Sequence, residues 1–199
     1  MDLRDILVFD VETTGLPAKG ADYKTDFNDF PRIVQLAYYL NGEYVNRIIK
    51  PEGWTIPVET TEIHGITTEY AMEVGIPFAT VADEFIFASS LAKWIVAHNI
   101  YFDTSLIKAN ILRLGMPHFS KQIVDPVLHK DKRIDTMKST IKFVGAKHSD
   151  GRGGKWPTLM ELYFKLWNEE FPAHDAIEDV KALVRCLPEL DKLGIIKFE

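Results

Sequence analysis

The sequence ILVFDVETTG at positions 6–15 ends an apolar run with two carboxylates, Asp10 and Glu12. A run of Ile, Leu, Val and Phe predicts a buried, central strand, and the two-residue period of a strand places both acids on one face. Two like charges on a buried face repel and lose hydration, so a divalent cation is their usual compensation. The pattern alone is equally compatible with two acids in solvent at a strand end, so partners elsewhere in the chain must decide.

Two more segments supply acids next to apolar runs. The stretch 95–99 (IVAHN) predicts a second strand, and Asp103 follows it at the turn into a helix whose apolar positions begin at Leu106. Near the C-terminus, a further helix is expected to open at His174, with Asp179 in its second turn. The acids therefore recur at strand and helix ends, where side chains from distant segments can meet.

The ordered set Asp-x-Glu, Asp and His-x4-Asp resembles the DEDDh family of 3′-to-5′ exonucleases, which includes the proofreading subunits of bacterial replicative polymerases, exonuclease X and ribonuclease T. The matching segments are DVETTGL at 10–16, HNIYFD at 98–103 and AHDAIEDV at 173–180. The resemblance runs from Ile6 to about Leu190. In the sister subclass a tyrosine stands four positions before the last aspartate, and here that position holds Asp175. The resemblance implies an α/β, ribonuclease H-like mixed sheet flanked by helices.

The resemblance also implies hydrolysis of phosphodiester bonds with two divalent cations, Mg²⁺ or Mn²⁺. Such hard cations prefer oxygen ligands, and Asp10, Glu12, Asp103 and Asp179 offer four carboxylates. His174 would then act as the general base that removes the proton from the attacking water. These five residues form the expected catalytic set.

A second group of residues is expected at the substrate. The resemblance implies that the backbone from Thr13 to Leu16 lies beside the terminal nucleotide, since Gly15 permits a close approach. Leu16 or Ile66 would pack on the bases. The alternative is that Gly15 and Leu16 only form a turn.

Other substrate contacts are more ambiguous. His64 either contacts the nucleotide or caps a helix, and Asn99 either binds a phosphate or sugar or closes a turn. Asp125 and Asp135 are interpreted as structural acids. Trp156, beside a basic glycine-rich stretch, is a candidate platform for a stacked base.

Length and composition favour one enzyme domain over residues 1–199. The chain has 199 residues and is 46% hydrophobic, which suffices for a sizeable core. The Asn41-Gly42 dipeptide between two apolar runs predicts a β-hairpin. Helices are expected over 67–72, 77–89, 158–167 and the C-terminal segment, whereas strands at 122–125 and 133–136 are uncertain. The connection 17–31 is long for this family.

The net charge of −6 is unusual for a protein that binds nucleic acid, but the charge is unevenly distributed. Residues 130–155 carry a net charge of +5, and the rest of the chain carries −11. This basic segment, with Lys147, Arg152 and Lys155 in its glycine-rich part, either meets phosphates or is a solvated face.

The chain offers no pairing for a disulfide, because Cys186 is its single cysteine and is expected to be a buried thiol. No apolar stretch approaches 18 residues, and no basic leader with a cleavage site precedes the first strand. We therefore expect an intracellular, cytoplasmic protein without a membrane partner.

The leading functional hypothesis is a 3′-to-5′ exonuclease on single-stranded DNA ends that releases 5′-mononucleotides, either free-standing or attached to a DNA polymerase. An RNA exonuclease of the same family is the first alternative, because no residue that reads a 2′-hydroxyl can be named. A non-catalytic nucleic-acid-binding module is the second. The complete set of acids and the histidine argue against the module. The oligomeric state is open.

Overall fold

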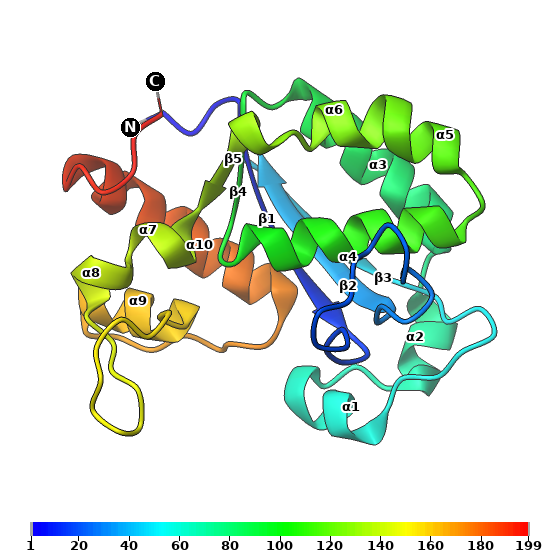
Figure 1. The fold of residues 1–199 in the computed structure, drawn as a ribbon, viewed down its shortest axis with the longest axis horizontal. Coiled ribbons are helices and arrows are strands. Elements are labelled where there is room, and N and C mark those ends of the chain that lie inside the picture. Colours follow the sequence, from blue (N-terminus) through cyan, green and yellow to red (C-terminus); the bar gives the residue numbers. More distant parts are fainter. Residues whose placement is uncertain (1, 199) are drawn as a thin grey trace.

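The computed structural model describes residues 2–198, except for the side chain of Pro117. A five-stranded mixed sheet, in the order β3-β2-β1-β4-β5, forms its centre (Figure 1). The strands are β1 (Ile6–Thr13), β2 (Ile33–Leu40), β3 (Glu43–Ile48), β4 (Trp94–Ala97) and β5 (Arg133–Asp135). The first three strands pair antiparallel, whereas β4 lies parallel to β1 and to β5. This arrangement confirms the predicted α/β mixed sheet and the central position of the first strand.

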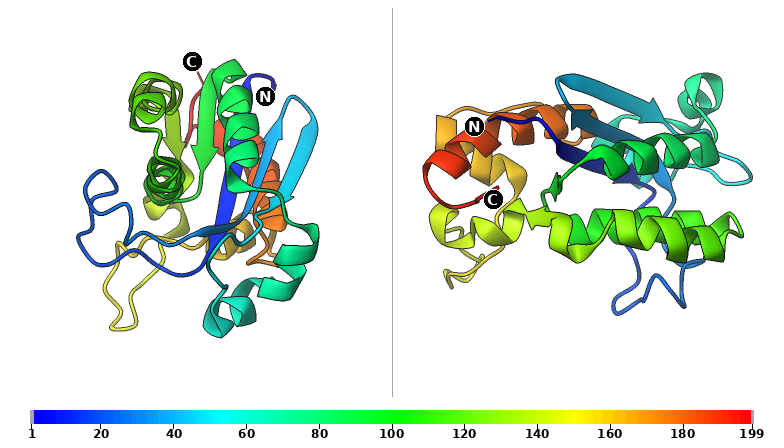
Figure 2. Two further views of the ribbon diagram at one scale, coloured as in Figure 1. Left: turned by 90° about the vertical axis from the view of Figure 1, so that its right-hand side faces the viewer. Right: turned by 90° about the horizontal axis from the view of Figure 1, so that it is seen from above.

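Helices cover both faces of the sheet. The longer ones are α3 (Phe78–Leu91), α4 (Ile100–Arg113), α9 (Leu159–Trp167) and α10 (Ala176–Lys192). The shorter ones are α1 (Val58–His64), α2 (Thr68–Val74), α5 (Pro117–Phe119), α6 (Asp125–Val127), α7 (Thr136–Ser139) and α8 (Ile141–Val144), with a π-helical segment at Ser120–Val124 and a 3₁₀ turn at Lys130–Lys132. In Figure 2, α10 lies on one side of the strands and α4 on the other.

The alternation along β1 assigns its side chains to the two layers. Leu7, Phe9 and Val11 pack into the core that includes α3 and α4. Ile6 and Val8 pack instead against the buried side of α10. Asp10 and Glu12 continue the α10 side toward the end of the strand, as the two-residue period predicts. This is why both acids reach the start of α10.

The hairpin between β2 and β3 has the predicted turn. Asn41 and Gly42 both have positive φ angles, 51° and 94°, as a type I′ turn requires. The turn joins Leu40 and Glu43, which are paired across the two strands. The register of the sheet edge is therefore set by this dipeptide.

The expected helices are present, with small shifts of their ends. Thr67 caps α2, and Thr158 forms a reciprocal capping box with Glu161 at the start of α9. The C-terminal helix begins at Ala176, later than predicted, because the Asp175 side chain accepts a hydrogen bond from the backbone N–H of Ile177 as its N-cap. Asp179 consequently lies in the first turn and not in the second.

Of the two segments that were uncertain as strands, one is helical and one contains a strand. The segment 122–125 is helical: it spans the end of the π-helical turn and the start of α6, with Val124 fully buried and Ile123 exposed. The segment 133–136 contains β5. The long connection 17–31 has no regular element, and its aromatic residues Tyr23, Phe27 and Phe30 pack on the core that includes α3 and α4. Within residues 2–198, no helix combines the length and hydropathy needed to span a membrane.

Candidate active site

The predicted acids come together at one end of β1. Asp10, Glu12 and Asp179 each have a carboxylate oxygen, and these three oxygens lie within 4.8 Å of one another. They line a cavity of about 450 Å³ that also receives Asp103 and His174. The three contributing segments are the end of β1 and the first turns of α4 and α10. The structure therefore places all five predicted catalytic residues around one opening.

Asp103 is the most buried of these acids. It lies in the first turn of α4 with 3% of its surface exposed, outside the group of three oxygens that meet within 4.8 Å. Its Oδ2 is buried and has no hydrogen-bond partner among the described residues. Burial raises the pKa of Asp103, and the negative charge of Asp135 raises it further. An unpartnered buried carboxylate oxygen is costly unless a cation or proton satisfies it.

Burial and mutual repulsion disfavour the charged forms of the cluster. Burial raises the pKa of Glu12 to about 7, with the charges of Asp179 and Asp175 adding to the effect. Burial likewise raises the pKa of Asp179 to about 7, although a hydrogen bond from the backbone of His174 opposes the shift. The pKa of Asp10 lies well above its ordinary value because of burial and then of the charge of Asp103. A bound divalent cation would reverse this balance, so the donor set fits a metal site.

His174 lies at the mouth of the cavity, directly before α10. It is exposed and adopts a left-handed backbone conformation, with φ 68°, which is rare for residues other than glycine. Its backbone N–H donates a hydrogen bond of 3.1 Å to Oδ2 of Asp179. This bond holds the turn so that the imidazole and the Asp179 carboxylate face the same opening.

Gln35 fixes the start of α10 and was not identified from the sequence. It is 2% exposed on β2, where it pairs with Glu12 across the sheet. Its amide NH₂ donates to Oδ1 of Asp175 at 2.7 Å, and its carbonyl accepts from the backbone N–H of Ala176 at 3.1 Å. A buried polar residue in an apolar strand was the available signal, because such a side chain requires partners. Gln35 therefore positions the turn that carries His174.

His98 of the second motif joins two walls of the cavity. One ring nitrogen lies 2.8 Å from the carbonyl oxygen of Pro157, and the other lies 3.1 Å from the hydroxyl of Thr136. Burial lowers the pKa of His98. Its ring therefore ties the end of β4 to the segment that bears Trp156.

The segment from Thr13 to Leu16, which was expected to lie beside the terminal nucleotide, ends in an exposed side chain. Leu16 is 82% exposed, and the Thr13 hydroxyl donates to the carbonyl of Gly15 at 2.7 Å. Gly15 has φ 143°, and a β-carbon added to it would meet no atom within 4 Å, so a side chain there is disfavoured by the backbone alone. Asn99, with φ 83°, precedes α4 and lines the cavity.

His64 and Ile66, both expected to contact the nucleotide, are buried and are not among the residues that line the acidic cavity. Ile66 is 6% exposed, because it packs into a small core with Val34 and Ile56. His64 ends α1 and is 8% exposed, and its Nδ1 accepts a hydrogen bond from the backbone N–H of Ile66 at 3.1 Å. Of the two alternatives for His64, the helix-end role matches this geometry.

The glycine-rich basic stretch is partly neutralised by its own neighbours. Arg152 pairs with Asp150 at 2.7 Å, and Lys155 pairs with Glu161 at 2.7 Å. Trp156 is 58% exposed and lines the acidic cavity, so its indole is available to a ligand there. Cys186 is buried, as expected, and burial raises its thiol pKa to about 12.

Comparison with known proteins places this site in a family. Residues 7–187 match the RNase_T family, described as exonuclease. The chain is 32% identical over 136 residues to a DNA polymerase III subunit epsilon-like protein of Rhodobacter capsulatus, covering 64% of this chain and 17% of that protein. It is 30% identical over 131 residues to the 3′-5′ exonuclease DinG of Bacillus subtilis, covering 64% of this chain and 13% of DinG. The chain thus spans less than a fifth of the length of these relatives.

Solved structures show the fold class. The structure is similar to E. coli exonuclease I in complex with a dA16 oligonucleotide, with a TM-score of 0.69 and 21% identity over 94% of this chain and 40% of that one. Exonuclease I from Methylocaldum szegediense matches with a TM-score of 0.68 and 20% identity over 96% of this chain and 41% of that one. The fold is therefore ribonuclease H-like. Together with the motifs, these matches show that the chain belongs to the DEDDh, DnaQ-like family of exonucleases, which are phosphodiester hydrolases.

Proposed function

We propose that residues 1–199 form one exonuclease domain that removes nucleotides from 3′ ends of single-stranded DNA. The observation that carries this proposal is the convergence of Asp10, Glu12 and Asp179 within 4.8 Å, with Asp103 and His174 on the same cavity. The names of the relatives support it. One is called a 3′-5′ exonuclease, and the exonuclease I structure holds a dA16 oligonucleotide.

Two divalent cations, Mg²⁺ or Mn²⁺, held by Asp10, Glu12, Asp103 and Asp179, would neutralise the phosphate oxygens and stabilise the leaving alkoxide. His174 takes the proton from the attacking water as its oxygen forms the new bond to phosphorus. The bond to the 3′ oxygen of the preceding nucleotide then breaks, and a 5′-mononucleotide leaves. The exposed position of His174 at the cavity mouth allows it to pass that proton to solvent.

The segment from Thr13 to Leu16 directly follows Glu12, which lines the cavity, and this position supports an orientation for the strand. The exposed Leu16 side chain packs on the terminal base, and Trp156 provides a second apolar surface from the opposite segment. Among the relatives, one is named as DNA polymerase III epsilon-like and others as PolC-type DNA polymerase III. These names make a DNA polymerase the first partner to test.

The test uses purified protein with Mg²⁺ or Mn²⁺ and linear single-stranded DNA labelled at its 5′ end. We expect a ladder that shortens from the 3′ end and releases 5′-mononucleotides. Circular single strands are the control and should resist. Digestion of circles at the linear rate would contradict the exonuclease assignment, and faster digestion of a matched RNA strand would contradict the DNA assignment.

A further inference from the structure

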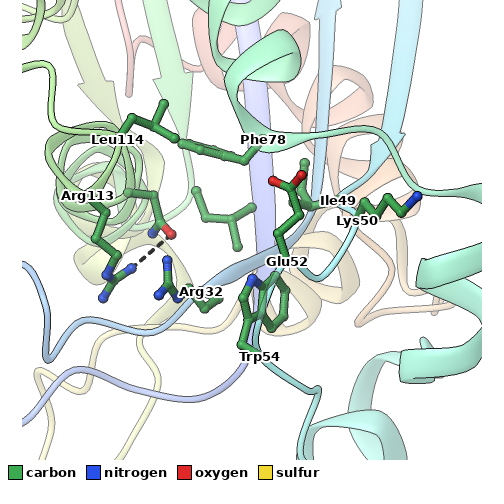
Figure 3. A pocket seen from close by; sticks show the side chains of 10 residues that line it. Arg32, Ile49, Lys50, Glu52, Trp54, Phe78, Arg113 and Leu114 are labelled. Atoms are coloured by element: carbon green, nitrogen blue, oxygen red, sulfur yellow. Dashed lines mark hydrogen bonds between the residues drawn. The ribbon is translucent and has the colours of Figure 1, made fainter.

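A second cavity lies away from the catalytic one and shares no lining residue with it. It has a volume of about 170 Å³ and opens between the start of β2, the start of α3 and the end of α4 (Figure 3). Ile33, Ile49 and Phe78 form its apolar part, and Trp54 forms a further wall. Two arginines, Arg32 and Arg113, reach it from segments that are distant in the sequence.

Arg113 is held in place by neutral acceptors. One of its guanidinium nitrogens donates to the side-chain oxygen of Asn110 at 3.0 Å, and another donates to the backbone carbonyl of Phe30. Asn110 is itself 4% exposed and anchored to the carbonyl of Pro31 at 3.0 Å. These bonds orient the guanidinium firmly, but they do not neutralise its charge.

Arg32 brings a second positive charge to the same place. Figure 3 shows its guanidinium directed toward that of Arg113. Within residues 2–198, neither arginine forms an ion pair, and the Arg32 side chain donates no hydrogen bond to the protein. Glu52 is the one carboxylate among the described lining residues, and it forms no ion pair with either of them. The cavity thus holds two like charges without a counter-charge from the described residues in contact.

This arrangement costs free energy unless an anion is bound. Burial lowers the pKa of Arg113 to about 10, with the charge of Arg32 adding to the effect and Asp29 opposing it. Burial also lowers the pKa of Arg32. Two partly desolvated guanidinium groups that face each other are stabilised when an anion lies between them.

We infer that Arg32 and Arg113 form a binding site for a phosphate group, outside the catalytic cavity. Planar guanidinium forks match the oxygens of a phosphate in pairs, and two forks together balance a doubly charged anion. A volume of about 170 Å³ admits a phosphate but not a whole nucleotide, so the organic part of an ester lies at the mouth, against the Trp54 indole.

The phosphate site is joined by hydrogen bonds to Thr14, two residues after Glu12 of the catalytic cavity. The backbone N–H of Arg32 donates to the Thr14 hydroxyl, and the Thr14 N–H donates to the Arg32 carbonyl, both at 2.9 Å. The phosphate is either free, as inorganic phosphate or a mononucleotide, or belongs to a single strand that crosses this face. Both sources present the same chemistry to the arginines.

The test follows the melting temperature in inorganic phosphate at constant ionic strength, without divalent metal or nucleic acid. About 20 mM phosphate should raise Tm by about 5 °C for a site with Kd near 1 mM. Arg32→Gln should lose this shift and, without phosphate, should melt at or above the wild-type temperature, because the repulsion is relieved. The matched control is Lys50→Gln, which removes the same charge from a side chain that points away from the arginines in Figure 3 and should keep the full shift.

A second experiment identifies whether the bound phosphate is free or belongs to a single strand. Binding of single-stranded DNA is measured in an Asp10→Asn background, which prevents digestion, with and without Arg32→Gln. If Arg32→Gln lowers the slope of log K against log salt concentration by about one, the site binds the strand; if the slope is unchanged and the response to 5′-mononucleotide is retained, the site binds free phosphate.

The inference is overturned if wild-type protein shows no shift in phosphate or if Arg32→Gln and Lys50→Gln respond alike. Should Arg32→Gln fail to fold, Arg32→Lys serves as the second variant, since it keeps the charge but loses the fork and should reduce the shift. Because the first arm uses neither strand nor metal, its result is independent of whether the chain is an exonuclease.

Discussion

Replacing Glu12 with glutamine should stabilise the metal-free protein at alkaline pH. The Glu12 side chain forms no hydrogen bond to a described residue, and burial together with neighbouring acids raises its pKa from 4.5 to about 7. One pKa unit corresponds to about 1.4 kcal/mol, so the charged carboxylate costs at most about 3.5 kcal/mol. Because the cavity opens to solvent, we expect Glu12→Gln to gain about 1–2 kcal/mol at pH 8.5.

The raised pKa of Glu12 makes the folded protein less stable as the pH rises. Below about pH 4.5 the carboxyl is protonated in both the folded and the unfolded chain, and its effect on stability vanishes. Between about pH 4.5 and 7 the folded chain retains a proton that the unfolded chain has lost, so stability falls as the pH rises. Above about pH 7 the destabilisation is complete. Glu12→Gln should therefore flatten this fall.

Urea unfolding in EDTA at pH 5 and pH 8.5 measures the effect. Glu62→Gln, an exposed position, is the matched control and should change the unfolding free energy by less than about 0.5 kcal/mol. With Mg²⁺ present, the wild-type protein should be more stable than Glu12→Gln, because the variant lacks one metal ligand and is stabilised less by the cation. If Glu12→Gln were no more stable than wild type at pH 8.5 in EDTA, the reasoning about the acidic cluster would be wrong.

Three other outcomes follow from the site. His174→Ala should slow turnover by about 10²–10⁴-fold with single-strand affinity largely kept, and an unchanged pH–rate profile would place the base elsewhere. Gln35→Leu should cost about 1–3 kcal/mol in urea unfolding and also slow turnover, since the start of α10 loses its partners; wild-type rates would exclude a positioning role. A triple variant that neutralises Lys147, Arg152 and Lys155 should bind single strands with a shallower slope of log K against log salt concentration, by at most about one per lost phosphate contact. An unaltered slope would show that the basic segment is only a solvated surface.

Local patterns were sufficient for the strand and the motif residues. The two-residue period of β1 correctly placed Asp10 and Glu12 on one face, because side-chain direction in a strand depends only on position along it. The Asn41-Gly42 turn was predictable for a similar reason, since its positive φ angles are a property of those two residues. Each of these features is decided within a few residues of the chain.

Features that join distant segments were not predictable in this way. Ile66 has the same apolar character whether it faces a base or a core, and only its packing with Val34 of β2, Ile56 and α2 buries it. Gln35 and Asp175 are 140 positions apart, and Arg32 lies far in the sequence from Arg113. Periodicity and propensity concern neighbours along the chain, whereas such contacts depend on strand order and helix packing. The sequence alone thus determined which acids are present and which face of the strand carries them. The hydrogen bonds of Gln35 to the start of α10, and the pairing of Arg32 with Arg113, exist only because the folded sheet brings their segments together.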